Sequence, residues 1–247
     1  MTAADASFQD YFSSDTSLSA PPGHPETPPS IHPAAWVDQP AHIGMNTSIA
    51  PFSHVAAHSH IGAGCTIGHH VTIAAGVVLG QHVTVMDHAH VASGVILDNH
   101  VFCGNNTVFM PLHRLRPLAL QRQRTHDAIR PTMIRQGATL GPGCAIALGA
   151  SIGAFAFVEK NTVITENVPP YAIVAGDPMV VVGWRCACGH HLDTPKNQGR
   201  KTRSSLMRNS ITTVTCGHCT RQYTPDARGH WAAVLGDPRT VTVARPA

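Results

Sequence analysis

The sequence has few charged and few aromatic side chains: 13% of its 247 residues are Asp, Glu, Lys or Arg, and 5% are Phe, Trp or Tyr. So few aromatic residues favour a core of repeated aliphatic layers over a mixed, irregular one. The formal net charge of +3 is too small to indicate a nucleic-acid partner. No apolar run approaches the ~20 residues that a membrane-spanning helix needs, and the first residues lack the basic and apolar regions of a secretory signal. We therefore expect a cytoplasmic protein.

An aliphatic residue, or a close substitute, recurs at every sixth position through residues 37–109. A small or β-branched residue stands two positions before each of them. An α-helix has a period of 3.6 and a strand a period of two, so neither explains a period of six. A coil with three short flat faces does, and hexapeptide repeats are typical of β-helices. The recurring residues are Ile43, Ile49, Val55, Ile61, Ile67, Ile73, Leu79, Val85, Val91, Leu97, Cys103 and Phe109.

The same period returns in a second tract, after an interruption. The step from Phe109 to Ile134 is one position longer than a multiple of six, so residues 110–133 must leave the coil as a loop. With three hexads per turn, the two tracts predict an all-β parallel β-helix of roughly six turns. The recurring residues of the second tract are Ile134, Leu140, Ile146, Ile152, Val158 and Ile164.

The composition divides the chain into three expected parts. Residues 1–30 are rich in Ser, Thr, Pro, Ala and acidic residues without periodicity, which predicts a disordered N-terminal tail. Residues 31–184 are expected to form the β-helix with its inserted loop. Residues 185–247 lose the hexads, and we expect a small zinc-ribbon-like domain there.

The cysteines support that last assignment. Four of the seven form a C-x-C…C-x2-C arrangement, namely Cys186, Cys188, Cys216 and Cys219. In a cytosolic protein this spacing favours a structural zinc site, with a redox or disulfide pair as the alternative. His190 or His191 is a possible substitute for one cysteine ligand. A small domain with so few aliphatic residues needs such a cross-link. The remaining cysteines occupy coil positions and are expected to be inert buried thiols: Cys65, Cys103 and Cys144.

The predicted loop is strongly cationic. It contains five arginines against a single acid, Asp127. The planar guanidinium donates hydrogen bonds that suit phosphate oxygens, so we expect Arg114 and Arg116 to bind substrate. The alternative is a solvated basic loop that packs on a neighbouring subunit. The five are Arg114, Arg116, Arg122, Arg124 and Arg130.

Four segments resemble a known family. Residues 134–184, together with IHPAAWVD at 31–38, APFSHV at 50–55 and VFCGNN at 101–106, are similar to bacterial hexapeptide-repeat acetyltransferases. The resemblance is strongest to enzymes that N-acetylate nucleotide-linked 3-amino sugars, such as UDP-2-acetamido-3-amino-2,3-dideoxyglucuronate.

This resemblance implies a left-handed coil, a homotrimer, and acetyl-CoA in a groove between neighbouring prisms. The cofactor would be met by the second tract, around Ala147, Gly149 and Ala154, with positive charge from Arg135 and Lys160. The sequence departs from the family at Pro111, which stands where those enzymes have an active-site asparagine. The N-P-R that follows in the family is represented only by Arg116, and Met86-Asp87-His88 replaces glutamine- and asparagine-rich positions one coil earlier.

Acetyl transfer to an amine requires placement of the amine, a lone pair on nitrogen and stabilisation of the oxyanion. Imidazole titrates near neutrality, so His113 is the first candidate for the general base, with His88 and His90 as second choices. Asp87 is a candidate to hold an imidazole in one tautomer. Asn105 and Asn106 are candidates to bind sugar hydroxyls or the carbonyl.

Three alternatives remain from the sequence. A general base beside the substituted asparagine leaves O-acetyl transfer to a sugar hydroxyl open. The many histidines of the coil, with MDHAH at 86–90 as the best local segment, allow a metalloenzyme that resembles γ-class carbonic anhydrases. The third alternative is a coil without catalytic activity that serves as a scaffold.

Overall fold

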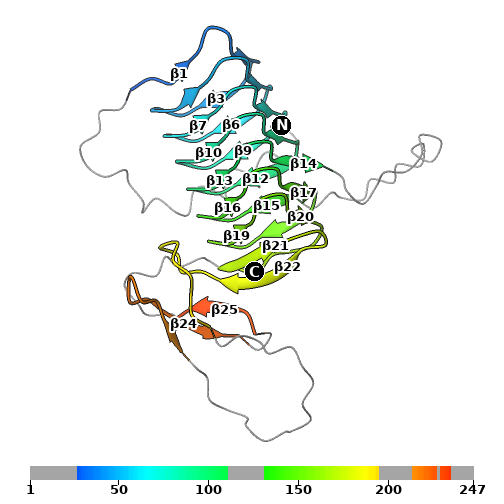
Figure 1. Cartoon of the computed structure of the whole chain (residues 1–247). Coiled ribbons are helices and arrows are strands. Elements are labelled where there is room, and N and C mark those ends of the chain that lie inside the picture. The colour runs from blue at the N-terminus through cyan, green and yellow to red at the C-terminus, as the bar shows by residue number, and fades with distance from the viewer. Residues whose placement is uncertain (1–26, 111–130, 195–212, 227–228, 235–247) are drawn as a thin grey trace, which may run out of the picture.

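The computed structural model describes residues 27–110, 131–194, 213–226 and 229–234. All regular structure in these ranges is β, which confirms the predicted class. No helix in the described ranges is long and apolar enough to cross a membrane. Figure 1 shows the short strands stacked in chain order, from β1 at one end to β21 at the other, with β22, β24 and β25 beyond that end.

Three parallel sheets form the faces of the coil, and we call them sheets A, B and C in the order in which the chain first visits them. Sheet A contains β1 (Ser30–Ile31), β4 (Ser48–Ile49), β7 (Thr66–Ile67), β10 (Thr84–Val85), β13 (Phe102–Cys103), β16 (Thr139–Leu140), β19 (Phe157–Val158), β21 (Ala172–Ala175) and the antiparallel β22 (Val180–Trp184). Sheet B contains β2 (Trp36–Val37), β5 (His54–Val55), β8 (Thr72–Ile73), β11 (His90–Val91), β14 (Val108–Met110), β17 (Ala145–Ala147) and β20 (Val163–Ile164). Sheet C contains β3 (His42–Ile43), β6 (His60–Ile61), β9 (Val78–Leu79), β12 (Val95–Leu97), β15 (Thr132–Ile134) and β18 (Ser151–Ile152).

One turn of the coil consists of three hexads. Ser48 pairs with Thr66, and Thr66 pairs with Thr84. The result is a parallel β-solenoid of about seven turns, which fits a left-handed β-helix. The turn count exceeds the expected six because β1 starts before the first hexad tract and β21 lies after the second. Thr27 also contacts the coil through a 2.9 Å hydrogen bond from its N–H to Asn46 Oδ1, although the sequence places it in the tail.

The core consists of the two predicted ladders. The recurring aliphatic residues point inward and are almost all buried, and so are the small residues two positions before them. Two of the buried hydroxyl groups donate hydrogen bonds to backbone carbonyls of the next turn: Thr47 Oγ1 donates to Gly62 O at 2.9 Å, and Ser53 Oγ donates to Gly68 O at 2.6 Å. The layers therefore repeat the same aliphatic packing, which is why a local repeat specifies the fold.

The three coil cysteines are buried, as predicted. Burial raises the pKa of Cys65 to about 11 and that of Cys103 to about 12, and it also raises the pKa of Cys144. These thiols are therefore protonated near neutral pH and are unsuited to nucleophilic chemistry.

The insertion lies at the corner between sheets B and C. Leu97 pairs with Ile134, although partners in other neighbouring turns, such as Ser48 and Thr66, are only three hexads apart. The additional residues between Leu97 and Ile134 make up the insertion. Strand β14 extends to Met110 and β15 begins at Thr132, so the predicted loop 110–133 is too long at both ends. Residues 111–130 lie outside the described part of the chain.

The far end of the coil meets a second, smaller unit. Its three antiparallel strands are β23 (Val214–Thr215), β24 (Gln222–Pro225) and β25 (Trp231–Ala233). Tyr171 of the last turn stacks on Phe155 with ring centroids 5.6 Å apart, and it meets Tyr223 edge-on at 5.2 Å. An aromatic contact therefore joins the solenoid to the three-stranded sheet.

Candidate functional site

The corner where the chain passes from sheet A to sheet B, which we call the A–B corner, carries a column of polar side chains. Residues that are three hexads apart in the sequence stack here across successive turns. The column brings together Asp87, His88, Asn105, Asn106 and, further along, Lys160. Five of the residues predicted to bind or react therefore share one edge of the prism.

Asp87 holds an imidazole, as expected, but its partner in the structure is His69, one turn earlier. Asp87 Oδ1 accepts the His69 backbone N–H at 2.7 Å and lies 3.2 Å from His69 Nδ1. These two contacts, the backbone one first, lower the pKa of the Asp87 carboxyl. The carboxylate reaches the backbone because residue 68 is glycine, where a Cβ would collide with Asp87 Oδ1. Both side chains remain accessible to solvent.

The neighbouring position of each turn forms a column of rings. Phe52 stacks on His70 with centroids 5.1 Å apart, and His70 stacks on His88 at 5.0 Å with an angle of 4° between the planes. All three residues, and Asn106 above them, have positive φ values between 55° and 63°. The left-handed conformation at each corner fixes where these side chains leave the backbone. His88 is thus one ring of a stack, while His69 is the ring that bonds Asp87.

A shallow groove of about 520 Å³ leads to this pair along the first four turns. It follows sheet A and the A–B corner, and its lining includes His32, Ser48, Thr66, Met86, His69 and Asp87. The groove therefore places a histidine–carboxylate pair beside hydroxyl groups and the Met86 side chain. Sequence reasoning missed His69 as a partner of Asp87, although their separation by three full hexads is a signal that finds it.

The other predicted site residues lie elsewhere. His113, Arg114 and Arg116 fall outside the described residues. Ala147 and Gly149 lie at the corner between sheets B and C, where the insertion begins. Here the N–H of Leu148, between the two, donates to Met110 O at 3.0 Å.

Arg135 and Ala154 lie at the third corner, between sheets C and A. Arg135 Nη1 is 3.7 Å from Asp98 Oδ2. Burial raises the pKa of Asp98, and the charge of Arg135 opposes that rise. Ala154 O accepts the N–H of Tyr171 at 2.9 Å, so it faces the C-terminal end of the coil. The five residues proposed for the cofactor are thus spread over three corners of one chain.

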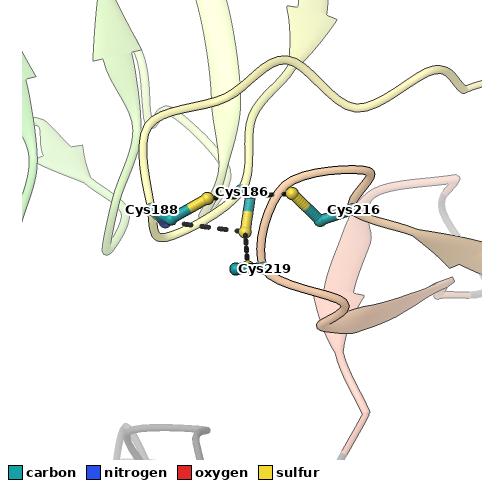
Figure 2. A group of neighbouring side chains, drawn as sticks. All are labelled: Cys186, Cys188, Cys216 and Cys219. Carbon is teal, nitrogen blue, oxygen red and sulfur yellow. Dashed lines mark hydrogen bonds between the residues drawn. The ribbon is translucent and has the colours of Figure 1, made fainter.

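The four cysteines predicted to bind metal converge in the C-terminal part (Figure 2). All four sulfurs lie within 4.8 Å of one another. Cys186 Sγ is 3.3 Å from Cys219 Sγ, and Cys188 Sγ is 3.7 Å from Cys216 Sγ. A tetrahedral zinc ion with Zn–S bonds of about 2.3 Å requires sulfurs about 3.8 Å apart. The set therefore has the ligand type and the approximate spacing that a zinc ion requires, and all four cysteines are free of disulfide bonds.

Two tight turns create this cluster. In the first, Gly189 N–H donates to Cys186 O at 2.9 Å, and in the second Thr220 N–H donates to Cys216 O at 3.0 Å. Tyr223 Oη donates to Cys186 Sγ at 3.0 Å and accepts the N–H of Ala187 at the same distance. The tyrosine thus supports one sulfur from outside the cluster, a common arrangement around metal ligands.

The coil histidines do not form a comparable group within the described residues of one chain, where the groups of three or more close ligand atoms all lie among residues 186–219. The coil histidines stack in pairs instead: His42 on His60 at 4.4 Å, and His82 on His100 at 5.1 Å. The described residues of one chain therefore offer no direct support for the alternative that resembles carbonic anhydrase.

Comparison with known proteins agrees with the repeat. Residues 40–75 match the family model described as bacterial transferase hexapeptide (six repeats). Over 67 residues the chain is 34% identical to dTDP-3-amino-3,6-dideoxy-alpha-D-galactopyranose 3-N-acetyltransferase of Aneurinibacillus thermoaerophilus. This chain resembles the hexapeptide-repeat acyltransferases.

The matches cover only parts of the proteins compared. The alignment with the Aneurinibacillus protein covers 27% of this chain and 35% of that protein. A second one, with the bifunctional protein GlmU of Thermotoga sp. (strain RQ2), is 41% identical over 56 residues and covers 22% and 13%. Among solved structures, the acetyltransferase domain of PglB from Neisseria gonorrhoeae is similar with a TM-score of 0.44 at 21% identity, covering 64% of this chain and 58% of that one.

Proposed function

We propose that this protein is an acyltransferase that uses acetyl-CoA to acetylate the amine of a nucleotide-linked amino sugar, and that it acts as a homotrimer. The observation that carries the proposal is the 34% identity over 67 residues with a protein named as a nucleotide-sugar 3-N-acetyltransferase. The hexapeptide match at residues 40–75 and the coil with three hexads per turn support it.

The chemistry requires one proton acceptor. The amine nitrogen bonds to the thioester carbonyl carbon, the C–S bond breaks, CoA leaves as the thiolate, and the surplus amine proton passes to a base. Because Asp87 is ionised, a hydrogen bond with His69 Nδ1 requires the proton to be on Nδ1. This tautomer leaves a lone pair on His69 Nε2, which is the form of imidazole that acts as a general base.

We therefore assign His69, positioned by Asp87, as the base supported by the described residues, and we keep His113 as a second candidate. Asn105 and Asn106 lie on the same corner one turn further along, and we keep them as candidates to bind sugar hydroxyls or the carbonyl. Arg114 and Arg116 are proposed to contact the nucleotide phosphates.

The positions of the proposed cofactor residues support an assembly of more than one prism, such as the proposed trimer. Arg135 and Ala154 border sheet A on one side and Lys160 borders it on the other, whereas Ala147 and Gly149 lie at the opposite corner. No single face of a three-sided prism touches all three corners. One CoA molecule meets all five positions only if a second prism supplies some of them.

The test is release of the CoA thiol by the full-length protein with acetyl-CoA and a panel of nucleotide-linked amino sugars. We expect release with the amines and none with the corresponding hydroxyl sugars. Release with the hydroxyl sugars alone would instead indicate O-acetyl transfer. Absence of both turnover and CoA binding would refute the proposal.

The base is tested by single substitutions in the same assay. His69→Ala should lower kcat by about 10²- to 10⁴-fold, whereas His58→Ala, an exposed corner histidine outside the groove, should leave it unchanged. If His113→Ala abolishes turnover and His69→Ala does not, the base lies in the inserted loop.

We also propose that the C-terminal part is a zinc-ribbon-like domain in which Cys186, Cys188, Cys216 and Cys219 hold a structural zinc ion. The sulfur separations support this proposal, and so does the small apolar cluster beside them, which centres on Tyr223 and Trp231. Treatment with a strong chelator should disorder Trp231 and change its fluorescence while the β-solenoid signal in circular dichroism persists. An unchanged Trp231 environment after verified loss of metal would contradict a structural role.

A further inference from the structure

A second group of ligand atoms lies against the four cysteines. The Cys188 sulfur and ring nitrogens of His190 and His218 all lie within 4.8 Å of one another. Cys188 Sγ is 3.6 Å from His190 Nδ1, and the two imidazole rings stack with centroids 3.9 Å apart and planes 10° from parallel. Cys188 belongs to both groups, so they share one sulfur.

The turns that gather the cysteines also place the histidines. His190 follows Cys188 by two positions in the first turn, and its carbonyl accepts the Cys186 N–H at 2.7 Å. His218 stands between Cys216 and Cys219 in the second turn. Both histidines are exposed, whereas Cys186 and Cys216 are buried. The shared sulfur therefore lies between a buried thiol group and an exposed imidazole pair.

We propose that Cys188 bridges two metal ions: the zinc ion held by the four cysteines, and a second divalent ion held by Cys188, His190 and His218. This inference rests on the zinc site proposed above. A thiolate has lone pairs for two ions, and imidazole suits zinc. To direct one nitrogen each at the same ion, the two rings turn out of their parallel stack, which their exposure allows. Three protein ligands leave one coordination position of the outer ion for water or a small ligand.

Charge balance favours the second ion. One divalent ion among four thiolates leaves a net charge of −2 in a cluster of which two sulfurs are buried. A second divalent ion with two neutral imidazoles brings the net charge to zero. Partly buried charge is costly unless it is compensated, so the outer ion stabilises the thiolate cluster as well as the two turns.

The inner and outer ions should differ in how readily they exchange. Four thiolates from two turns enclose the inner position, whereas exposed histidines and an open coordination position border the outer one. A mild chelator should therefore remove one equivalent quickly and the second slowly. The outer ion would be the one accessible to small ligands.

Metal stoichiometry of the full-length protein, loaded with Zn²⁺ and measured by native mass spectrometry and elemental analysis, tests the proposal. We expect two ions per chain, and one in the H190A/H218A double variant. His191→Ala, an exposed histidine of the same segment that is absent from the ligand group, should retain two. The Cys216→Ser variant should weaken the inner site, because it removes one of its four sulfurs.

The outcomes separate this inference from the structural zinc. One ion in both the unmodified protein and the double variant would overturn the bridged pair and leave the four-cysteine site standing. No bound ion would refute both sites. Cobalt substitution distinguishes the remaining case: a single ion whose absorption bands shift in the double variant would have mixed sulfur and nitrogen ligands, which also overturns the pair.

Discussion

Arg185 joins the last turns of the solenoid to the C-terminal part, and its removal should loosen that junction. Its Nε donates to Phe155 O at 2.6 Å, and Nη2 lies 3.0–3.1 Å from Gly137 O, Thr139 Oγ1 and Ala156 O. The guanidinium also lies 5.1 Å from the centroid of the Phe157 ring. Burial lowers the Arg185 pKa to about 10, so the group is still charged at neutral pH.

The expected cost of Arg185→Ala follows from these contacts. A hydrogen bond from a charged donor contributes roughly 1.5–3 kcal/mol. Three of the four contacts share the Nη2 nitrogen, so together they count as little more than one full hydrogen bond. The truncation also removes a charged group whose burial is itself unfavourable, and this partly offsets the loss of the hydrogen bonds. We therefore expect a loss of about 2–4 kcal/mol, which corresponds to a roughly 30- to 700-fold larger equilibrium constant for opening at this end.

Hydrogen exchange with mass spectrometry measures this local loss, because a solenoid can open at one end while other turns stay intact. Peptides that cover residues 153–192 should lose protection in the Arg185→Ala variant, whereas peptides from residues 48–85 should not. Arg185→Lys should recover little, since an ammonium group cannot reproduce the planar fork. The reasoning would be refuted if exchange in residues 153–192 were no faster than in Lys160→Ala, an exposed change at another corner.

Three further predictions concern the coil itself. Ile61→Ala empties part of a fully buried layer and should cost about 2–5 kcal/mol in urea unfolding, whereas Ile31→Ala, at 41% exposure, should cost less than about 1 kcal/mol. Gly143→Ala should cost at least about 1 kcal/mol in thermal unfolding, because its φ is +73° and the new Cβ would strike Asn161 Oδ1. Burial and a stacked neighbour lower the pKa of His60 below 6.5. The unfolded chain then binds more protons as the pH falls below that value, so stability should drop between pH 7.5 and 5.5, and His60→Gln should reduce the drop.

The strands of the coil could be predicted from the sequence because each turn repeats the same local interactions. All eighteen recurring residues, from Ile43 to Ile164, lie in strands of the three sheets. The last turn escaped this reasoning for a physical reason. Phe157 pairs with Ile173, which falls two positions short of three full hexads, so no hexad marks that strand. The contacts of Arg185 could not be predicted from the sequence either, because its partners lie about 30 to 48 positions earlier and the segment between them does not follow the hexad period throughout.

The cysteine cluster was predictable for a different reason. Cys186 and Cys188 are two positions apart and Cys216 and Cys219 three apart, and such short spacings allow two turns to present four sulfurs whatever the rest of the fold does. The stacking of His190 on His218 depends on how the two turns face each other, and that information is absent from either turn alone.

At the A–B corner, the period of six residues does not determine which outward-facing side chains contact one another. The chain has eighteen histidines, and the hexads assign most of those in the coil to outward positions without distinguishing among them. The structure adds a second period, because residues three hexads apart stack across turns: His69 lies beneath Asp87, and His70 beneath His88. Once the spacing of three hexads is known, the sequence predicts that Asp87 contacts His69, one turn earlier, and no longer points to a residue of the inserted loop. A carboxylate that is fixed by a backbone N–H, has a lowered pKa and faces an imidazole then follows from position.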